Sequence, residues 1–402
     1  MNMEIAEALQ KTKNKFAELD EISLYNQKKV LDAFAKNQVA LRHFAGTSGY
    51  GNDDVGRDTL NLVFADVFGA EKAIASPLIA SGTHALTLAL FGVLRPGDVV
   101  LSVSGEPYDT LQGIIHGSDI GSLHDFGIEF CSIPLLKNDF DYKKIATFLK
   151  NHKVKMVYVQ RSRGYAWRLA LKISQIEQLC QFVKDISPNS VIFCDNCYGE
   201  FVETREPTEV GVDYCAGSFI KNIGGGLAPT GGYVVGKAKF IDLVAGRYTV
   251  PNIGTEIGSY TGGYRLFYQG IFSAPHVVNQ AIKTALLFSQ CLTNRGYDVS
   301  PRPNEHFGDI VCSIKLGDEQ KMVKFCQAIQ SVAPVDGFVT PEPWNQPGYS
   351  DKVIMAAGCF VQGASIELSC DGPIREPYIV YLQGGLTLEH GILALESVLS
   401  KL

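Results

Sequence analysis

The sequence predicts an α/β fold, with a mainly parallel sheet in a large domain and a smaller α+β domain at the C-terminal end. Helix-like stretches alternate with short strands that have no polar face. Such strands are typical of a parallel sheet covered by helices on both sides. After about residue 290 the pattern changes, which indicates the second domain. Hydrophobic residues make up 46% of the chain and charged residues 19%, enough apolar material for a large core.

The individual elements follow from the apolar periodicity and from the polar residues that interrupt it. In the large domain we expect strands over residues 98–103, 128–133, 156–160, 191–194 and 233–235. We expect helices there over residues 62–68, 81–94, 141–151 and 174–185. In the smaller domain we expect strands at 310–314 and 379–382, and helices around 322–329 and 388–402.

The N-terminal part differs from the rest of the chain. Residues 1–40 are charged and helix-like, and we expect them to pack as an arm on the body or on a partner subunit. Residues 41–60 are rich in Gly, Asn and Asp, which indicates a loop. We therefore divide the chain into an arm and loop (1–55), a large ligand-binding domain (56–285) and a small C-terminal domain (286–402).

Composition and charge exclude several classes of function. The net charge of −6 argues against binding to nucleic acid, which requires a basic face. The N-terminal stretch has no apolar signal-peptide core, and no apolar run approaches the roughly 20 residues that cross a bilayer. We therefore expect a cytoplasmic protein with no membrane partner.

The cysteines and histidines predict no metal site. Ten cysteines are scattered through apolar stretches and are expected to be reduced, buried thiols. Cys194 and Cys197 have CxxC spacing, but neither a second pair nor a thioredoxin-like context accompanies them. The eight histidines are dispersed, with no spacing typical of metal ligands.

Polar residues at the ends of predicted strands are the candidates for chemistry, because ligands of parallel sheets bind at that edge. The first group is Ser81, Gly82, Thr83 and His84, at the start of a helix. Free N–H groups and the helix dipole favour a phosphate there, and Gly82 would let it approach closely. An ordinary helix cap would use the same residues.

The second and third features carry opposite charges. Asp195 ends the strand at 191–194, and a buried carboxylate needs a partner such as a protonated pyridine nitrogen, or else a cap or salt bridge. Lys221 precedes a run of three glycines. Burial and nearby cations lower a lysine pKa, so that its amine can form a Schiff base; the alternative is a lysine that extends into solvent. Ser218 is a further candidate phosphate ligand.

Two more groups of residues follow predicted strands. Tyr108 comes after the strand at 98–103 and would either stack on a planar cofactor or pack on the core. Arg161, Ser162 and Arg163 follow the strand at 156–160, and we expect all three to line the same pocket.

Together these residues resemble the fold-type-I enzymes that depend on pyridoxal 5'-phosphate (PLP), whose spacing suits the 26 residues from Asp195 to Lys221 (221 − 195). The resemblance is closest to the lyases of cysteine and methionine metabolism, cystathionine lyases and methionine γ-lyase. Within them it is closest to the branch called the cystathionine β-lyase family, involved in aluminium resistance. The segments that carry it lie between about residues 45 and 280 and are TSGYGNDDVGRD, SGTHAL, QRSRGYAWR, DNCYGEFVE, GSFIKNIGGGLAPTGGY and GGYRLFYQGIFSAPHVV.

The resemblance implies roles for the residues of the cofactor site. Lys221 would form the Schiff base with PLP and shuttle the proton between the α-carbon and the leaving group. Asp195 would pair with the pyridine nitrogen. Gly82, Thr83 and Ser218 would bind the phosphate.

It also implies roles for residues outside that group. Tyr108 would stack on the ring and take part in proton transfer. Tyr50 and Arg57 would reach the phosphate of a neighbouring subunit, although their spacing is longer than the usual Tyr-x-Arg. Arg375, whose fork suits a carboxylate, would clamp the substrate. The resemblance further implies a homotetramer, built as a dimer of dimers with active sites shared between subunits.

The implied function is a PLP-dependent carbon–sulfur lyase, which acts on an amino acid of the cystathionine, cysteine or methionine type by β- or γ-elimination. Two alternatives remain at this point: a PLP-dependent aminotransferase, and a PLP-binding stress-response protein with little turnover. A desulfurase is disfavoured, because it needs a mobile cysteine and Cys359 lies in an apolar segment.

Overall fold

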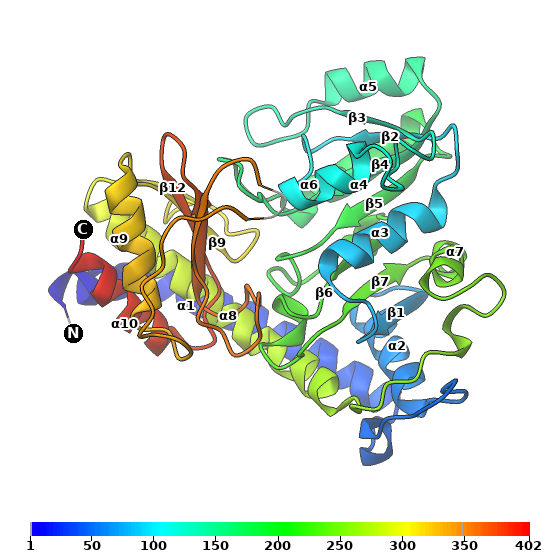
Figure 1. Ribbon diagram of the computed structural model, residues 1–402, viewed down its shortest axis with the longest axis horizontal. Coiled ribbons are helices and arrows are strands. Elements are labelled where there is room, and N and C mark those ends of the chain that lie inside the picture. The colour runs from blue at the N-terminus through cyan, green and yellow to red at the C-terminus, as the bar shows by residue number, and fades with distance from the viewer. Residues whose placement is uncertain (1, 347–348) are drawn as a thin grey trace.

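The computed structural model describes residues 2–346 and 349–402, which form two sheets connected by long helices (Figure 1). The larger sheet has seven strands in the order β1-β7-β6-β5-β4-β2-β3. Neighbouring strands from β2 to β6 are parallel, whereas β7 is antiparallel to both β6 and β1. The prediction of a mainly parallel sheet in the large domain is therefore confirmed.

The strands of the larger sheet are β1 (Lys72–Ser76), β2 (Val99–Ser102), β3 (Glu129–Ser132), β4 (Val154–Gln160), β5 (Val191–Asp195), β6 (Tyr214–Ser218) and β7 (Gly232–Gly236). Its helices are α2 (Val55–Val67), α3 (Gly82–Val93), α4 (Asp109–His116), α5 (Tyr142–Asn151), α6 (Ile173–Ile186) and α7 (Ala238–Tyr248). Successive residues of β4 alternate between two apolar clusters: Met156 and Tyr158 pack with α3, α4 and α7, and Val157 and Val159 with α2, α5 and α6. This two-sided burial explains why the strand has no polar face.

The smaller sheet is antiparallel throughout, in the order β10-β11-β12-β9-β8. Its strands are β8 (Asp298–Ser300), β9 (Val311–Lys315), β10 (Val353–Ala356), β11 (Ser369–Pro373) and β12 (Ile379–Gln383). Helices α9 (Glu319–Gln330) and α10 (Leu388–Leu399) accompany it. The expected elements at 310–314, 322–329, 379–382 and 388–402 are thus present as β9, α9, β12 and α10.

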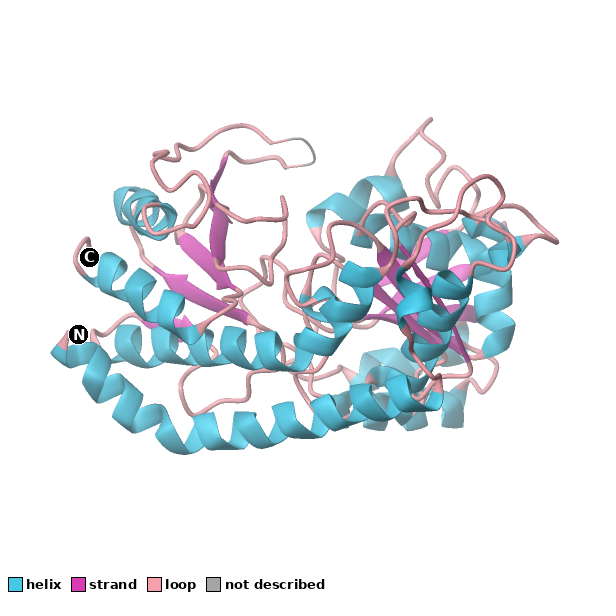
Figure 2. Ribbon diagram, turned by 90° about the horizontal axis from the view of Figure 1, so that it is seen from below, coloured by secondary structure: helices cyan, strands magenta, loops and turns pink. Residues whose placement is uncertain are grey.

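Two long helices, α1 (Met3–Lys36) and α8 (Arg265–Asn294), lie side by side and run past both sheets (Figure 2). The N-terminal arm is therefore a helix that packs on the body of its own chain. The sequence did not predict α8, whose interior contains Pro275; the Pro275 carbonyl accepts a hydrogen bond from Ser23 of α1. The boundary proposed at 285/286 falls inside α8, and the division into domains stays a prediction.

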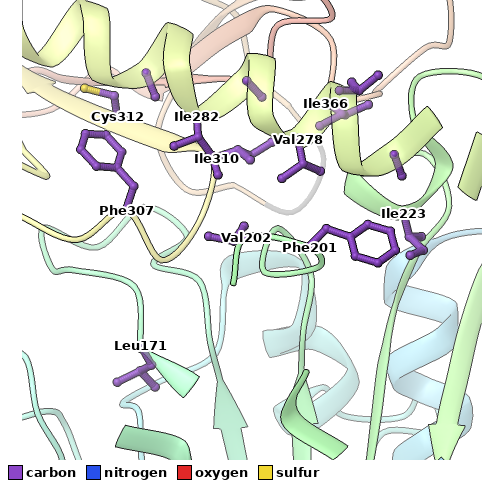
Figure 3. Packing of buried hydrophobic residues seen from close by; sticks show 14 of the residues in the cluster. Leu171, Phe201, Val202, Ile223, Val278, Ile282, Phe307, Ile310, Cys312 and Ile366 are labelled. Atoms are coloured by element: carbon purple, nitrogen blue, oxygen red, sulfur yellow. The ribbon is translucent and has the colours of Figure 1, made fainter. Parts of the chain in front are cut away.

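The apolar core is continuous between the two sheets through α8. Val278 and Ile282 of α8 lie near Ile310, which precedes β9, and Val202, which follows β5 (Figure 3). All four belong to one buried cluster. This helix therefore sets how the smaller sheet sits on the larger one. None of the helices in the described ranges, α8 included, combines the length and the apolar run that crossing a membrane would require.

The predicted loop at 41–60 is partly helical. A 3-10 helix, η1 (Leu41–Phe44), lies at its start, and α2 begins at Val55 within the expected loop. Asp54 caps α2, since its carboxylate accepts hydrogen bonds from the N–H groups of Gly56 and Arg57. The Asp that indicated a loop is in fact a helix start signal.

A further contact joins α8 to the turn after Lys221, which forms the short 3-10 helix η3 (Asn222–Gly224). Gly225 has φ +55°, and a Cβ there would lie 2.5 Å from the Gly270 carbonyl oxygen of α8. Only glycine fits this position. The glycines after Lys221 thus serve contact with α8 as well as the turn.

We expect Gly225→Ala to destabilise the protein through both effects. The left-handed conformation costs a side chain about 1–2 kcal/mol, and the clash with α8 adds roughly 1–3 kcal/mol. Gly317→Ala is the matched control, because Gly317 has φ +69° but open space around it. Thermal unfolding should show a clearly larger loss for Gly225→Ala; equal losses would contradict the packing argument.

Candidate active site

A cavity of about 460 Å³ opens where the carboxyl ends of β4, β5 and β6 meet the smaller sheet. Its walls come from the larger sheet, including Asp195 and Ser218, and from the smaller sheet, including Val311 and Tyr381. The volume is in the range of small-molecule sites. The cavity lies at the strand edge that the sequence indicated.

The start of α3 forms one end of the cavity. Ser81 caps the helix by accepting the His84 N–H at its side chain and the Ala85 N–H at its carbonyl. The N–H groups of Gly82 and Thr83 are therefore left for an outside acceptor. A Cβ on Gly82 would lie 3.0 Å from the Ser218 Cβ, so glycine keeps this end open.

Ser218 faces the same end of the cavity from the last position of β6. Its hydroxyl is buried and has no hydrogen-bond partner among the described residues. A buried hydroxyl without a partner is costly. Together with the N–H groups of Gly82 and Thr83, it makes a donor set that suits a phosphate.

Asp195 ends β5 and is buried, with one carboxylate oxygen accepting the Cys197 N–H at 3.0 Å. Burial raises its pKa, and Lys221 opposes that rise. The carboxylate has room for a second donor from the cavity side, which is what a protonated ring nitrogen offers.

Lys221 follows β6, and its Nζ lies 4.2 Å from the centre of the Tyr198 ring. Burial alone would lower the pKa of Lys221, but Cys197, Tyr198, Tyr108 and Asp195 together raise it well above the ordinary value. The expectation that nearby cations lower this pKa is therefore wrong for the chain alone. The groups around the amine are acids, and the chain itself holds it protonated.

Tyr108 lies at the start of α4 and lines the cavity. Its hydroxyl pairs with the Thr83 hydroxyl at 3.0 Å, and its N–H donates to Gln160. Burial, and secondarily Asp195, raise the pKa of Tyr108, so the phenol is neutral. Tyr108 thus contacts the phosphate-binding end through Thr83 and shares the cavity lining with Asp195 and Lys221.

The three residues that follow β4 do not all lie in the same place. Ser162 and Arg163 line the cavity and both contact the buried Asp309, Ser162 by a hydrogen bond of 2.9 Å and Arg163 at 3.5 Å. Arg161 does not line the cavity. It is completely buried and donates to Gly199 and to Glu203. The expectation that all three share the pocket is therefore wrong for Arg161, whose guanidinium binds these partners in the segment after β5 instead.

Arg375 lies in the turn between β11 and β12 and lines the cavity, half exposed. Its guanidinium contacts Asp351 at 3.1 Å. Sequence reasoning missed the neighbouring cavity residues Tyr165, Tyr198, Tyr349, Asp371 and Tyr381. Tyr165 and Tyr198 follow strand ends and could have been found by that signal, whereas the other three depend on how the smaller sheet docks.

Tyr50 and Arg57 lie outside the cavity lining. Tyr50 is 75% exposed. Arg57 is buried at the start of α2 and donates to the Gly51 carbonyl and to Asp58. Within its own chain neither residue reaches the Lys221 site.

The cysteines form no disulfide in the structure. Cys197 lines the cavity, whereas Cys194 is buried in the core. Cys359 is also buried, with its thiol directed at the Ala364 carbonyl. Over residues 2–346 and 349–402 no group of His, Cys, Asp or Glu could hold a metal ion.

The residues present fit PLP. The orphaned Ser218 hydroxyl and the opening at Gly82 match a phosphate. Asp195 is a buried carboxylate for a ring nitrogen, and Lys221 provides an enclosed amine. These features on this sheet define a fold-type-I enzyme that uses PLP.

The comparisons with known proteins identify the family. A family model described as methionine gamma-lyase matches residues 1–402. The chain therefore belongs to the methionine gamma-lyase family and is a PLP-dependent carbon–sulfur lyase. Nothing in the comparisons favours an aminotransferase or a binding protein with little turnover.

The relatives agree with this assignment. The Bacillus subtilis protein YnbB is 50% identical over 377 residues, 93% of this chain and 89% of its own. A carbon–sulfur lyase involved in aluminum resistance from Clostridium novyi is 47% identical, with a TM-score of 0.95 over 99% of this chain and 94% of its own. The PLP-dependent protein YhfS of Escherichia coli shares the fold at 16% identity, with a TM-score of 0.64 over 95% of this chain and 97% of its own.

Two carboxyl groups in the segment after β5 have pKa shifts of opposite direction. Burial raises the pKa of Glu200 to about 8; one of its oxygens accepts a hydrogen bond from Tyr233, and the other has no partner in the described chain. Burial also acts on Glu203, but His306 and Arg161 outweigh it and lower the pKa to about 2. The folded state therefore favours a neutral Glu200 and a charged Glu203.

We expect the two glutamine variants to change stability in opposite directions. The unfolded chain ionises Glu200 near pH 4.5 and the folded protein only near pH 8, so the wild type loses stability between these values. The loss is up to about 1.4 kcal/mol per pH unit, and Glu200→Gln does not have it because glutamine does not ionise. This variant should therefore unfold at a higher temperature than wild type at pH 8, but not at pH 5. Glu203→Gln should unfold at a lower temperature than wild type at both pH values, because the lowered pKa of Glu203 stabilises the folded protein above pH 4.5. Thermal unfolding at the two pH values measures both, and a loss of stability for Glu200→Gln at pH 8 would refute the assignment.

Proposed function

We propose that this protein cleaves the carbon–sulfur bond of a sulfur-containing amino acid by β- or γ-elimination. The thiol leaves first, and water then hydrolyses the remaining unsaturated amine to an oxoacid and ammonia. The observation that carries this proposal is the convergence of Lys221, Asp195 and Ser218 on one cavity that also contains the open end of α3. Substrates of the cystathionine, cysteine and methionine types share the bond that such a site would break.

The residues divide the work between binding and proton transfer. PLP, when bound, supplies an aldehyde that condenses with an amine and a ring that accepts an electron pair. The N–H groups of Gly82 and Thr83 and the Ser218 hydroxyl hold its phosphate, and Asp195 keeps its ring nitrogen protonated. Lys221 carries the cofactor.

Proton transfer is the second task of the site. In its uncharged form, the Lys221 amine takes the α-proton of the substrate and then returns a proton to the departing sulfur. Tyr108 would stack on the ring. Its neutral hydroxyl, paired with Thr83, assists the transfer.

Substrate binding uses the wall from the smaller sheet. Arg375 exchanges its contact with Asp351 for the substrate carboxylate, for which its fork is suited. Its place in the cavity wall supports this role.

The assembly we propose is a homotetramer, a dimer of dimers in the cytoplasm. In it, Tyr50 and Arg57 reach the phosphate in the neighbouring subunit. The exposure of Tyr50 and of two other apolar side chains in the same stretch of sequence, Leu41 and Leu62, supports a subunit contact that involves this stretch. Ten free cysteines are in keeping with a reducing compartment.

We expect purified wild-type protein to absorb visible light, and borohydride to remove that band and fix the reduced cofactor on Lys221. Lys221→Ala should carry no fixed cofactor, and its release of thiol and oxoacid from cystathionine, cysteine or methionine should fall by at least about 100-fold, since the residue supplies general base catalysis. Peptide mass spectrometry and the two product assays measure these outcomes.

Lys237→Ala is the matched control for this experiment. Lys237 also follows a strand of the larger sheet, but it is half-exposed, pairs with the buried Asp213 and lies outside the cavity lining. That variant should keep both the cofactor and the activity. Retention of a reducible band and of lyase activity in Lys221→Ala would show that another residue is the active amine.

A further inference from the structure

The cavity wall from the smaller sheet carries a carboxylate that the proposed chemistry does not use. Asp371 lies in β11, opposite Tyr381 of β12, and lines the cavity. Its Oδ1 atom is shielded from solvent and accepts no hydrogen bond from the described residues. Arg375, four residues further on, contacts Asp351 instead. The fold therefore places an uncompensated carboxyl group against the substrate space.

Burial raises the pKa of Asp371 to about 7, with the Tyr165 hydroxyl partly opposing the rise. No cation among the described residues contributes to this pKa shift. The Tyr165 hydroxyl is a neutral partner, whereas a protein rarely encloses a carboxyl group without a charged one. A carboxyl group of this kind in a cavity is a candidate for contact with a ligand. A ligand that carries positive charge would supply the missing partner.

Three tyrosines lie close to Asp371: burial raises the pKa of each of them, and the charge of Asp371 raises it further. The Tyr165 ring lies 5.0 Å from that of Tyr381 and 5.9 Å from that of Tyr349, and all three residues line the cavity. The Tyr381 hydroxyl donates to the Tyr165 carbonyl at 2.5 Å, which holds the two residues together. Aromatic faces attract a cation and disfavour an anion. The rings and the carboxylate thus both favour a positively charged group.

We propose that Asp371, with Tyr165, Tyr349 and Tyr381, forms a subsite for an ammonium group on the thiol that leaves the substrate. This inference rests on the proposed function. The α-amino group of the substrate is engaged at Lys221, and its carboxylate would be repelled by Asp371. The part of the substrate left to face Asp371 is the portion beyond the sulfur. The protein therefore prefers thioethers or disulfides that carry an ammonium group beyond the sulfur. Substrates with an uncharged alkyl group at that place, such as methionine, are disfavoured.

Pairs of isosteric amino acids test this subsite. S-(2-aminoethyl)cysteine ends in an ammonium group where S-propylcysteine ends in a methyl group, and the two are otherwise the same. Lysine and 2-aminoheptanoate differ in the same way, but they have no carbon–sulfur bond and so report binding alone. We expect wild-type holoenzyme to cleave the first thioether with at least a tenfold higher kcat/KM, or to show the same preference with the homocysteine counterparts. Calorimetry should show at least tenfold tighter binding of lysine than of 2-aminoheptanoate, as a charge-assisted hydrogen bond provides.

Asp371→Asn should reduce both ratios to less than threefold, mainly through KM for the ammonium substrate. Asp298→Asn is the control: Asp298 is a half-exposed carboxylate of β8 in the same sheet, and its variant should keep both ratios. The comparison of ligands on wild-type protein remains informative if Asp371→Asn does not fold.

The outcomes separate the two proposals. Equal binding of lysine and 2-aminoheptanoate, or equal cleavage of the two thioethers, overturns the subsite and leaves the lyase function intact. Selective binding of lysine that depends on Asp371, with no cleavage of any thioether, supports the subsite and counts against the proposed function.

Discussion

The structure depends on keeping two opposite charges, those of Asp195 and Lys221, in one enclosed cavity. Moving a charged group from water into a protein costs roughly several kcal/mol of free energy, unless good partners compensate the charge. The parallel pairing of β5 with β6, which sets Asp195 beside Ala216, brings both groups to the same sheet edge. Each charge is then available to the other and to a ligand that bears both a ring nitrogen and an aldehyde.

The turn directly after Asp195 is strained, and buried polar contacts hold it. Tyr198 has φ +70° and Phe201 φ +61°, values that bulky residues rarely adopt. The Asn222 side chain donates to the Tyr198 carbonyl, and the Phe201 N–H donates to the buried carboxylate of Glu206. These buried contacts of Asn222 and Glu206 therefore fix the course of the chain on which the cofactor site is built.

Much of the site could be predicted because strand ends of a parallel sheet share one edge. Asp195 and Lys221 needed no further knowledge of the fold, and the Ser81 cap follows from local sequence alone. Arg161 could not be placed, because a shift of one residue at the end of β4 turns a side chain to the other face. Asp371 was missed for a different reason: its position depends on how the smaller sheet docks, and docking is set by packing on α8 that no local pattern reveals.

The same docking couples the two parts of the site. The Tyr198 ring lies against the Lys221 amine. The Tyr198 hydroxyl donates a hydrogen bond of 2.9 Å to Ser365, which lies in the segment before β11. Ser162 and Asp309 make a second such link. Because the links join the sheets beside the cavity, a displacement of the smaller sheet would act on the Lys221 amine as well as on the substrate wall. Cofactor chemistry and substrate choice are thus encoded on different sheets, but the geometry of one cannot change without the other.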